Sequence, residues 1–130
     1  MPKIIIASGP VIVENNQVLL NKHGDTAFWK FCGGRVKEDE DLMETTERRA
    51  KEEMGIAIKI LNKEPFLTFT RKETSEGIVD IILVHFLAAR IGEVKPGEDT
   101  REWQWLDVNN LPADLGPNII PALKYFGFIK

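Results

Sequence analysis

The sequence of 130 residues contains a single cysteine, Cys32, so no disulfide bond can form within the chain. No apolar run is long enough to span a membrane, because Asp80, His85 and Arg90 interrupt the most apolar stretch, residues 78–91. The N-terminal residues include only a short apolar run after one lysine, which is too little for a secretory signal. These features predict a cytoplasmic protein without a membrane span.

Linkers, internal repeats and low-complexity segments are also missing, and 130 residues fit one domain covering residues 1–130. Apolar residues make up 43% of the chain, which is enough for a core and excludes disorder of the whole chain. The net charge of −3 arises within segment 34–56, which holds eight acidic and five basic residues. An acidic segment argues against a nucleic-acid partner and leaves metal cations as candidates. The alternative is a solvated helix of mixed charge.

The hydrophobic pattern predicts several strands and one strong helix. Runs that are β-branched, aromatic or alternating predict strands at residues 4–13, 17–21, 28–31, 56–60, 66–71, 78–89 and 102–106. Asn15-Asn16 and the segment 74–77 are typical of tight hairpin turns. Helices are expected at 40–54 and, between a proline and a glycine, at 118–126. The expected fold is therefore a mixed sheet with few helices, in the α/β or α+β class.

The helix expected at 40–54 has three sectors on a helical wheel. One apolar sector should pack on the sheet, and it comprises Leu42, Met43, Thr46, Ala50 and Met54. A second sector lies beside it, and it comprises Thr45, Arg49, Glu52 and Glu53. Gly55 should end the helix. Adjacent carboxylates at the edge of a buried face, near the Gly33-Gly34 turn, are placed to hold a cation.

The same segment carries a motif with fixed spacing. It reads Gly34-x5-Glu40-x7-Arg48-Arg49-Ala50-x-Glu52-Glu53-x-Gly55-Ile56. This string resembles the Nudix box of the Nudix hydrolases, whose pattern is G-x5-E-x7-R-E-U-x-E-E-x-G-U, with U aliphatic. Every specified position of box 34–56 agrees except Arg49, where the family has glutamate. The resemblance implies a Nudix-like α-β-α sandwich with a mixed sheet between helices.

The resemblance also implies a divalent-metal hydrolase that acts on a nucleoside diphosphate linked to another group. Mg²⁺ or Mn²⁺ would be the cofactor, since Mg²⁺ takes oxygen ligands and binds through one or two carboxylates plus substrate phosphates. Glu52 and Glu53 are the expected metal ligands and catalytic residues, with Glu102 as an additional metal-facing carboxylate or else an exposed strand end. An acid in the loop Glu98-Asp99 could supply a base.

Other positions receive expected roles from the same comparison. Glu40 and Arg48 match positions that mainly hold loop and helix together, and Gly55 completes the box. The expected phosphate contacts are Gly33, Gly34, Lys22, Lys30 and Arg49. A close approach of phosphate or an unusual backbone angle would explain Gly34. Arg49 is expected to lower the number of metals bound, or to disable catalysis.

Several chemistry-bearing residues also have plain structural interpretations. The aromatic residues could stack on a base but are more often core: Trp29, Phe31, Trp103 and Trp105. Neither His23 nor His85 has the spacing of a zinc ligand. Cys32 is expected to pack rather than act as a nucleophile, because no histidine adjoins it.

The expected function is hydrolysis of a phosphoanhydride bond in a nucleoside di- or triphosphate derivative, of the nucleoside triphosphate pyrophosphatase type. ADP-ribose or another nucleoside diphosphate sugar is the alternative substrate. A degenerate domain that binds nucleotide without cleaving it is a second hypothesis, and a structural partner protein is a third. The apolar tail 126–129, if exposed, would favour a homodimer.

Overall fold

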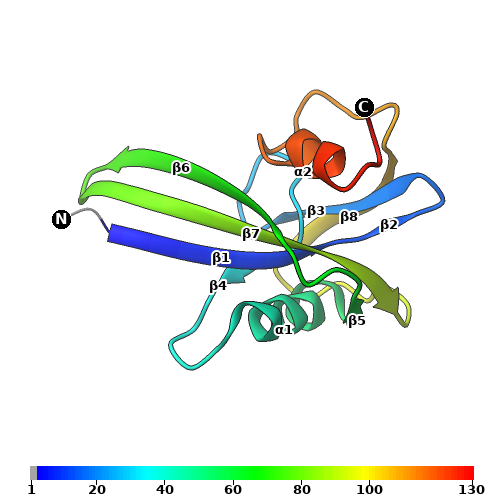
Figure 1. The fold of residues 1–130 in the computed structure, drawn as a ribbon, viewed down its shortest axis with the longest axis horizontal. Coiled ribbons are helices and arrows are strands. Elements are labelled where there is room, and N and C mark those ends of the chain that lie inside the picture. The colour runs from blue at the N-terminus through cyan, green and yellow to red at the C-terminus, as the bar shows by residue number, and fades with distance from the viewer. Residues whose placement is uncertain (1–2) are drawn as a thin grey trace.

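The computed structural model describes residues 3–130. Figure 1 shows the helices and strands of the chain. They are β1 (Lys3–Val11), β2 (Val13–Glu14), β3 (Gln17–His23), β4 (Gly34–Arg35), α1 (Leu42–Met54), β5 (Ala57–Ile60), β6 (Phe66–Thr74), β7 (Gly77–Ile91), β8 (Thr100–Asp107) and α2 (Ile119–Tyr125). Within the described residues, no helix is both long and apolar enough to cross a membrane.

The strands form two sheets between the two helices. In the larger sheet β7 pairs in parallel with β1 and antiparallel with β5 and β6, while β4 pairs antiparallel with β1. The smaller sheet has the order β2-β3-β8 and is antiparallel. Helix α1 lies on one side of the strands and α2 on the other (Figure 1). This confirms the α-β-α sandwich with a mixed sheet that the sequence predicts.

Strand alternation divides the core between the two helices. In β3, Val18 and Leu20 belong to the cluster around α2, whereas Leu19 belongs to the cluster around α1. Successive strand residues point to opposite faces, so each strand supplies both clusters in turn. On the α1 side, the buried Ser8 and Thr46 hydroxyls hydrogen-bond at 2.7 Å and attach the helix to β1.

Neighbouring residues cap helix α1 at both ends. Asp41 accepts a hydrogen bond from the Glu44 N–H, and the Glu44 carboxylate accepts one from the Asp41 N–H. This capping box satisfies amides that the first turn leaves free. Gly55 ends the helix in the left-handed region at φ 66°. The helix therefore starts at Leu42, two residues later than the sequence predicts.

The burial of α1 differs from the wheel in one important respect. Thr46, Ala50 and Met54 are buried as expected, but Leu42 and Met43 are only half-buried. Thr45 and Glu53, which the wheel places beside the packed face, are fully buried. The expectation that Glu53 lies at the edge of the buried face is therefore wrong.

Other elements test the strand predictions. The turn at Asn15-Asn16 is confirmed by positive φ angles of 50° and 62°, and β6 and β7 form the expected hairpin across Ser75-Glu76. The segment 28–31 is not a strand, because only Trp29 and Lys30 make isolated bridges there. The expected aromatic strand is replaced by an irregular segment that leads into Gly33.

The aromatic residues and the C-terminal tail are mostly part of the core. Trp29 and Phe31 are buried in the α2 cluster, and Trp103 and Trp105 pack partly against the α1 cluster. Phe126, Phe128 and Ile129 are half-buried against the α2 cluster. The tail 126–129 is therefore not exposed, and the argument that it favours a homodimer is wrong.

We predict that Gly55→Ala destabilises the protein more than Gly24→Ala does. Both glycines have left-handed φ angles, 66° and 61°, which cost an alanine roughly 1–2 kcal/mol. A Cβ at Gly55 would also lie 2.3 Å from the Lys95 carbonyl oxygen, whereas a Cβ at Gly24 meets nothing within 4 Å. Urea denaturation measures both variants, and equal losses would show that the Lys95 loop does not pack tightly on the helix end.

Candidate active site

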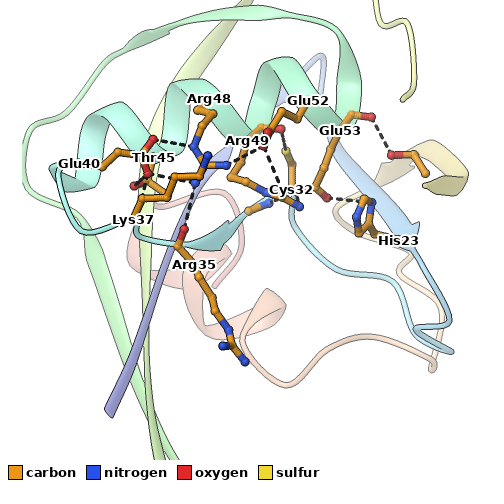
Figure 2. A network of polar contacts seen from close by, with 12 residues as sticks. His23, Cys32, Arg35, Lys37, Glu40, Thr45, Arg48, Arg49, Glu52 and Glu53 are labelled. Atoms are coloured by element: carbon orange, nitrogen blue, oxygen red, sulfur yellow. Dashed lines mark hydrogen bonds and ion pairs between the residues drawn. The ribbon is translucent and has the colours of Figure 1, made fainter. Parts of the chain in front are cut away.

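The carboxylate of Glu53, in the last turn of α1, is fully buried and receives contacts from three segments of the chain. The Gly33 N–H donates to Oε2 at 2.9 Å, and Asn21 Nδ2 donates to Oε1 at 3.2 Å. Three nitrogens of basic side chains also lie close to it: Arg49 Nη2 at 2.9 Å, Lys30 Nζ at 3.4 Å and His23 Nδ1 at 3.6 Å. Figure 2 shows His23 and Arg49 on two sides of this carboxylate.

These contacts hold Glu53 in its ionised form. Burial raises the pKa of the Glu53 carboxyl, but the charges of Lys30 and Arg49 and the Gly33 N–H lower the pKa more. The net result is a pKa below the ordinary value of a glutamate. A buried charge is stable only when it is paired and hydrogen-bonded, and both conditions hold here.

Arg49 joins the two glutamates of the last turn. Its guanidinium contacts Glu53 through Nε at 3.1 Å and Glu52 through Nη1 at 3.2 Å. Residues three and four apart on a helix are neighbours, so Arg49 reaches both carboxylates at once. The residue that departs from the motif therefore places a cation between the two carboxylates.

Gly34 provides the space that the guanidinium occupies. A Cβ at Gly34 would lie 2.5 Å from Arg49 Nε. The φ angle of Gly34 is not positive, so the expected unusual backbone angle is absent. The close approach is real, but its partner is the Arg49 side chain.

Glu40, Arg48 and Glu52 form a second ion network on the outer side of α1. Arg48 donates to Glu40 through Nε at 2.6 Å and to Glu52 through Nη1 at 2.7 Å. Its Nη2 also donates to the Arg35 carbonyl at 3.0 Å. Hydrogen bonds from Arg48 and Thr45 lower the pKa of Glu40 to about 2. The network fastens the segment 35–40 to the helix, as Figure 2 shows.

The loop before β8 is attached to the end of α1 through the backbone of Glu53. The Glu53 carbonyl accepts hydrogen bonds from the Gly97 N–H at 2.9 Å and from Thr100 Oγ1 at 2.7 Å. Glu98 and Asp99 lie between these two anchors and are exposed. The structure therefore places the two acids of this loop beside the Glu53 turn.

Glu102 and Lys22 lie on the other face of the small sheet. They occupy paired positions of β8 and β3, and Lys22 Nζ lies 3.7 Å from Glu102. Asn21 and Trp103, their neighbours in the strands, point toward α1, so Lys22 and Glu102 point away from it. Lys22 contacts Asp114 and the Trp29 ring there. The structure does not bring Glu102 or Lys22 to Glu53, whereas it does bring Lys30.

A pocket of about 260 Å³ adjoins the Glu53 cluster. Lys30 and Gly33, which both contact Glu53, line one part of it. Its other lining residues include Phe28, Phe31, His85 and Asn118. The pocket is thus polar and charged near α1 and aromatic toward α2.

His85 and Asn118 form the polar pair of the aromatic end. Asn118 Nδ2 lies 2.8 Å from His85 Nε2, and His85 Nδ1 is buried without a hydrogen-bond partner among residues 3–130. Burial lowers the pKa of His85 to about 4, so the imidazole is neutral at pH 7. A neutral imidazole paired with an amide presents hydrogen-bonding groups without charge.

Sequence reasoning missed the contributions of Asn21 and His23. Both are polar residues two apart in β3, which puts them on one face of the strand. Lys22 lies between them, so no polar and apolar alternation in the sequence marks this face. Cys32 has the expected packing role: burial raises the pKa of its thiol, and its Sγ donates to the Arg49 carbonyl.

Comparison with known proteins decides the family. The NUDIX domain model matches residues 5–126. The chain belongs to the Nudix family. Its Nudix box, residues 34–56, contains β4, the ion network of Arg48, and the Arg49 and Glu53 side chains.

Individual Nudix proteins show how far the similarity extends. The chain is 30% identical over 111 residues to an ADP-ribose pyrophosphatase of Methanocaldococcus jannaschii, a match covering 82% of this chain and 64% of that protein. The crystal structure of a MutT Nudix hydrolase from Burkholderia pseudomallei has a TM-score of 0.76 at 23% identity, covering 94% and 97% of the two chains. A Caenorhabditis elegans Ap4A hydrolase complex has a TM-score of 0.73 at 18% identity, covering 94% of each. The two structures show the shared fold.

We predict that Glu53→Gln costs about 3 kcal/mol of stability, because it leaves Arg49 and Lys30 without their common counter-charge. Glu52→Gln should cost less than about 1 kcal/mol, because the Glu52 side chain is 46% exposed. Urea denaturation at pH 7 compares the two variants. A loss for Glu53→Gln no greater than that for Glu52→Gln would contradict the role given to the buried charge.

Proposed function

We propose that this chain hydrolyses a phosphoanhydride bond in a nucleoside di- or triphosphate derivative, as a pyrophosphohydrolase of the nucleoside triphosphate type. One observation carries the proposal: Glu53 of the Nudix box contacts Lys30 and Gly33, which line a pocket with one charged and one aromatic end. Lys30 and Gly33 suit phosphate, and Phe28, Phe31 and the His85–Asn118 pair suit a planar base. A nucleotide carries phosphates at one end and a planar base at the other, which matches the two ends of the pocket.

The donor set fits a divalent ion that shares its coordination with the substrate. Glu52 and Glu53 offer carboxylate oxygens, and Glu52 is half-exposed. Among residues 3–130, no group of three or more His, Cys, Asp or Glu side chains converges as a metal cage. Two carboxylates with phosphates and water suit Mg²⁺ or Mn²⁺. When bound, the ion would neutralise phosphate oxygens and the leaving group.

The side chains around Glu53 have their own tasks in this proposal. Lys30 and Arg49 provide positive charge at the phosphate end of the pocket, and substrate phosphate competes with Glu53 for them. Glu98 or Asp99, in the loop anchored to Glu53, would hold the proton of the attacking water. Glu102, which pairs with Lys22 on the other face, has no part in this cluster.

Two alternatives have specific support. The M. jannaschii relative is described as an ADP-ribose pyrophosphatase, which favours ADP-ribose or a related nucleoside diphosphate sugar, although this chain spans only 64% of that protein. Arg49, which pairs with both glutamates, favours a domain that binds nucleotide without cleaving it. The proposal also includes a single domain over residues 1–130 and a cytoplasmic location.

We predict that the protein hydrolyses at least one compound in a panel of nucleoside triphosphates, nucleoside diphosphate sugars and ADP-ribose when Mg²⁺ or Mn²⁺ is present. EDTA, which removes the metal, should stop this hydrolysis. Glu52→Gln should lower kcat by about a hundredfold or more, since it removes a charged ligand while the fold remains. Glu47→Gln, on the exposed face of the same helix, is the matched control.

The release of phosphate or pyrophosphate measures the rate of hydrolysis by both variants. Equal rates for Glu52→Gln and Glu47→Gln would contradict the role of Glu52. Nucleotide binding without release from any compound would overturn the hydrolase and support the binding domain.

A further inference from the structure

A second pocket, of about 310 Å³, continues the first along the same face of the large sheet. The two pockets share Lys72 and Ile81. Three cationic residues line the second pocket, which we call the basic pocket: Lys3, Arg35 and Lys72. Glu76 is the one acid among its lining residues. The basic pocket is therefore positive on a chain whose net charge is −3.

Strand register explains why the three cations share one face. Lys3 and Lys72 are both paired with Val79, from β1 and β6 on the two sides of β7. Arg35 is paired with Ala7, four residues along β1 from Lys3. Paired residues in a sheet point to the same face, and an even spacing keeps that face. The cations therefore arise from the sheet architecture rather than from a loop.

These cations are not used inside the protein. None of the three side chains makes an ion pair or a side-chain hydrogen bond with another of residues 3–130, whereas Lys30, Arg48 and Arg49 are all paired with glutamates. Figure 2 shows the Arg35 side chain extending away from the ion network, although its carbonyl accepts from Arg48. The hydrogen bond from Arg48 thus holds the backbone of Arg35, while the Arg35 guanidinium points away from the ion network.

The position of Arg35 relates the basic pocket to the proposed reaction. Gly33 contacts Glu53, and Arg35 follows two residues later, about 7 Å further along an extended chain. A phosphate chain that begins beside Gly33, with the base toward His85 and Asn118, would extend toward Arg35 and Lys72. The cations would then face the end of the substrate opposite the base.

We propose that the basic pocket binds the terminal phosphates of the substrate, so that the protein prefers a nucleoside triphosphate to ADP-ribose. The distal end of ADP-ribose is an uncharged sugar, which gains nothing from three cations. This inference rests on the proposed function, because it uses that function to orient the nucleotide. Charge on the distal group is the property that the basic pocket selects.

The first test measures binding without turnover. Isothermal titration calorimetry with inorganic tripolyphosphate, without divalent metal and at low ionic strength, compares wild type with the double variant Arg35→Gln/Lys72→Gln. Exposed ion pairs are weakened by salt, so low ionic strength gives the clearest difference. We expect the double variant to bind about tenfold more weakly. The matched control Lys59→Gln/Lys63→Gln changes two exposed lysines, removes the same two positive charges and should bind like wild type.

Equal affinities for wild type and the double variant would overturn the proposal. An equal loss in Lys59→Gln/Lys63→Gln would also overturn it, since the effect would then reflect net charge alone. Because the titration needs no hydrolysis, its result stands whether or not the protein cleaves nucleotides. Thermal melting of both variants identifies any loss that comes from unfolding.

The second test uses two compounds with the same base. The ratio of kcat/KM for ATP to kcat/KM for ADP-ribose should exceed one in wild type. It should fall about tenfold in the double variant, because kcat/KM for ATP falls while kcat/KM for ADP-ribose stays the same. A preference for ADP-ribose that the double variant leaves unchanged would overturn the inference while the hydrolase proposal stands. If neither compound nor any other nucleotide is cleaved, the proposed function fails. The titration alone then shows whether the basic pocket binds a phosphate chain.

Discussion

The ionised carboxylate of Glu53, buried at the end of α1, is the constraint on which the rest of the site depends. Its charge is stable there only because Gly33, Asn21, Lys30 and Arg49 surround it. These groups come from β3, from the irregular segment before β4 and from the helix itself. One carboxylate therefore fixes how three parts of the chain meet, beside the pocket that Lys30 and Gly33 line.

Arg49 changes the electrostatics of this arrangement. In the family's pattern the position carries a glutamate, and here it carries a cation that pairs with both Glu52 and Glu53. A divalent ion and the guanidinium would compete for the same oxygens, so metal binding requires Arg49 to release at least one of them. Gly34 leaves room for the guanidinium where it now lies, and substrate phosphate offers it another partner.

The sequence predicts those features that local chemistry determines. The end of the helix at Gly55 and the turn at Asn15-Asn16 depend on neighbouring residues, and both are present. The burial of Glu53 depends on distant residues, so a helical wheel places it at an edge. The face of Glu102 depends on the register of β8 with β3, which no local pattern specifies. The motif identified the glutamates, but only the fold shows that Arg49 lies between them.

The most direct test of this account is the affinity for free Mn²⁺, measured by electron paramagnetic resonance without nucleotide. We expect weak binding by the wild type and at least about tenfold tighter binding by Arg49→Gln, because the substitution removes the competing cation. Lys51→Gln, an exposed change on the same helix, should bind like wild type. Equal affinity for Mn²⁺ in wild type and Arg49→Gln would contradict the claim that Arg49 occupies the place of a metal between Glu52 and Glu53.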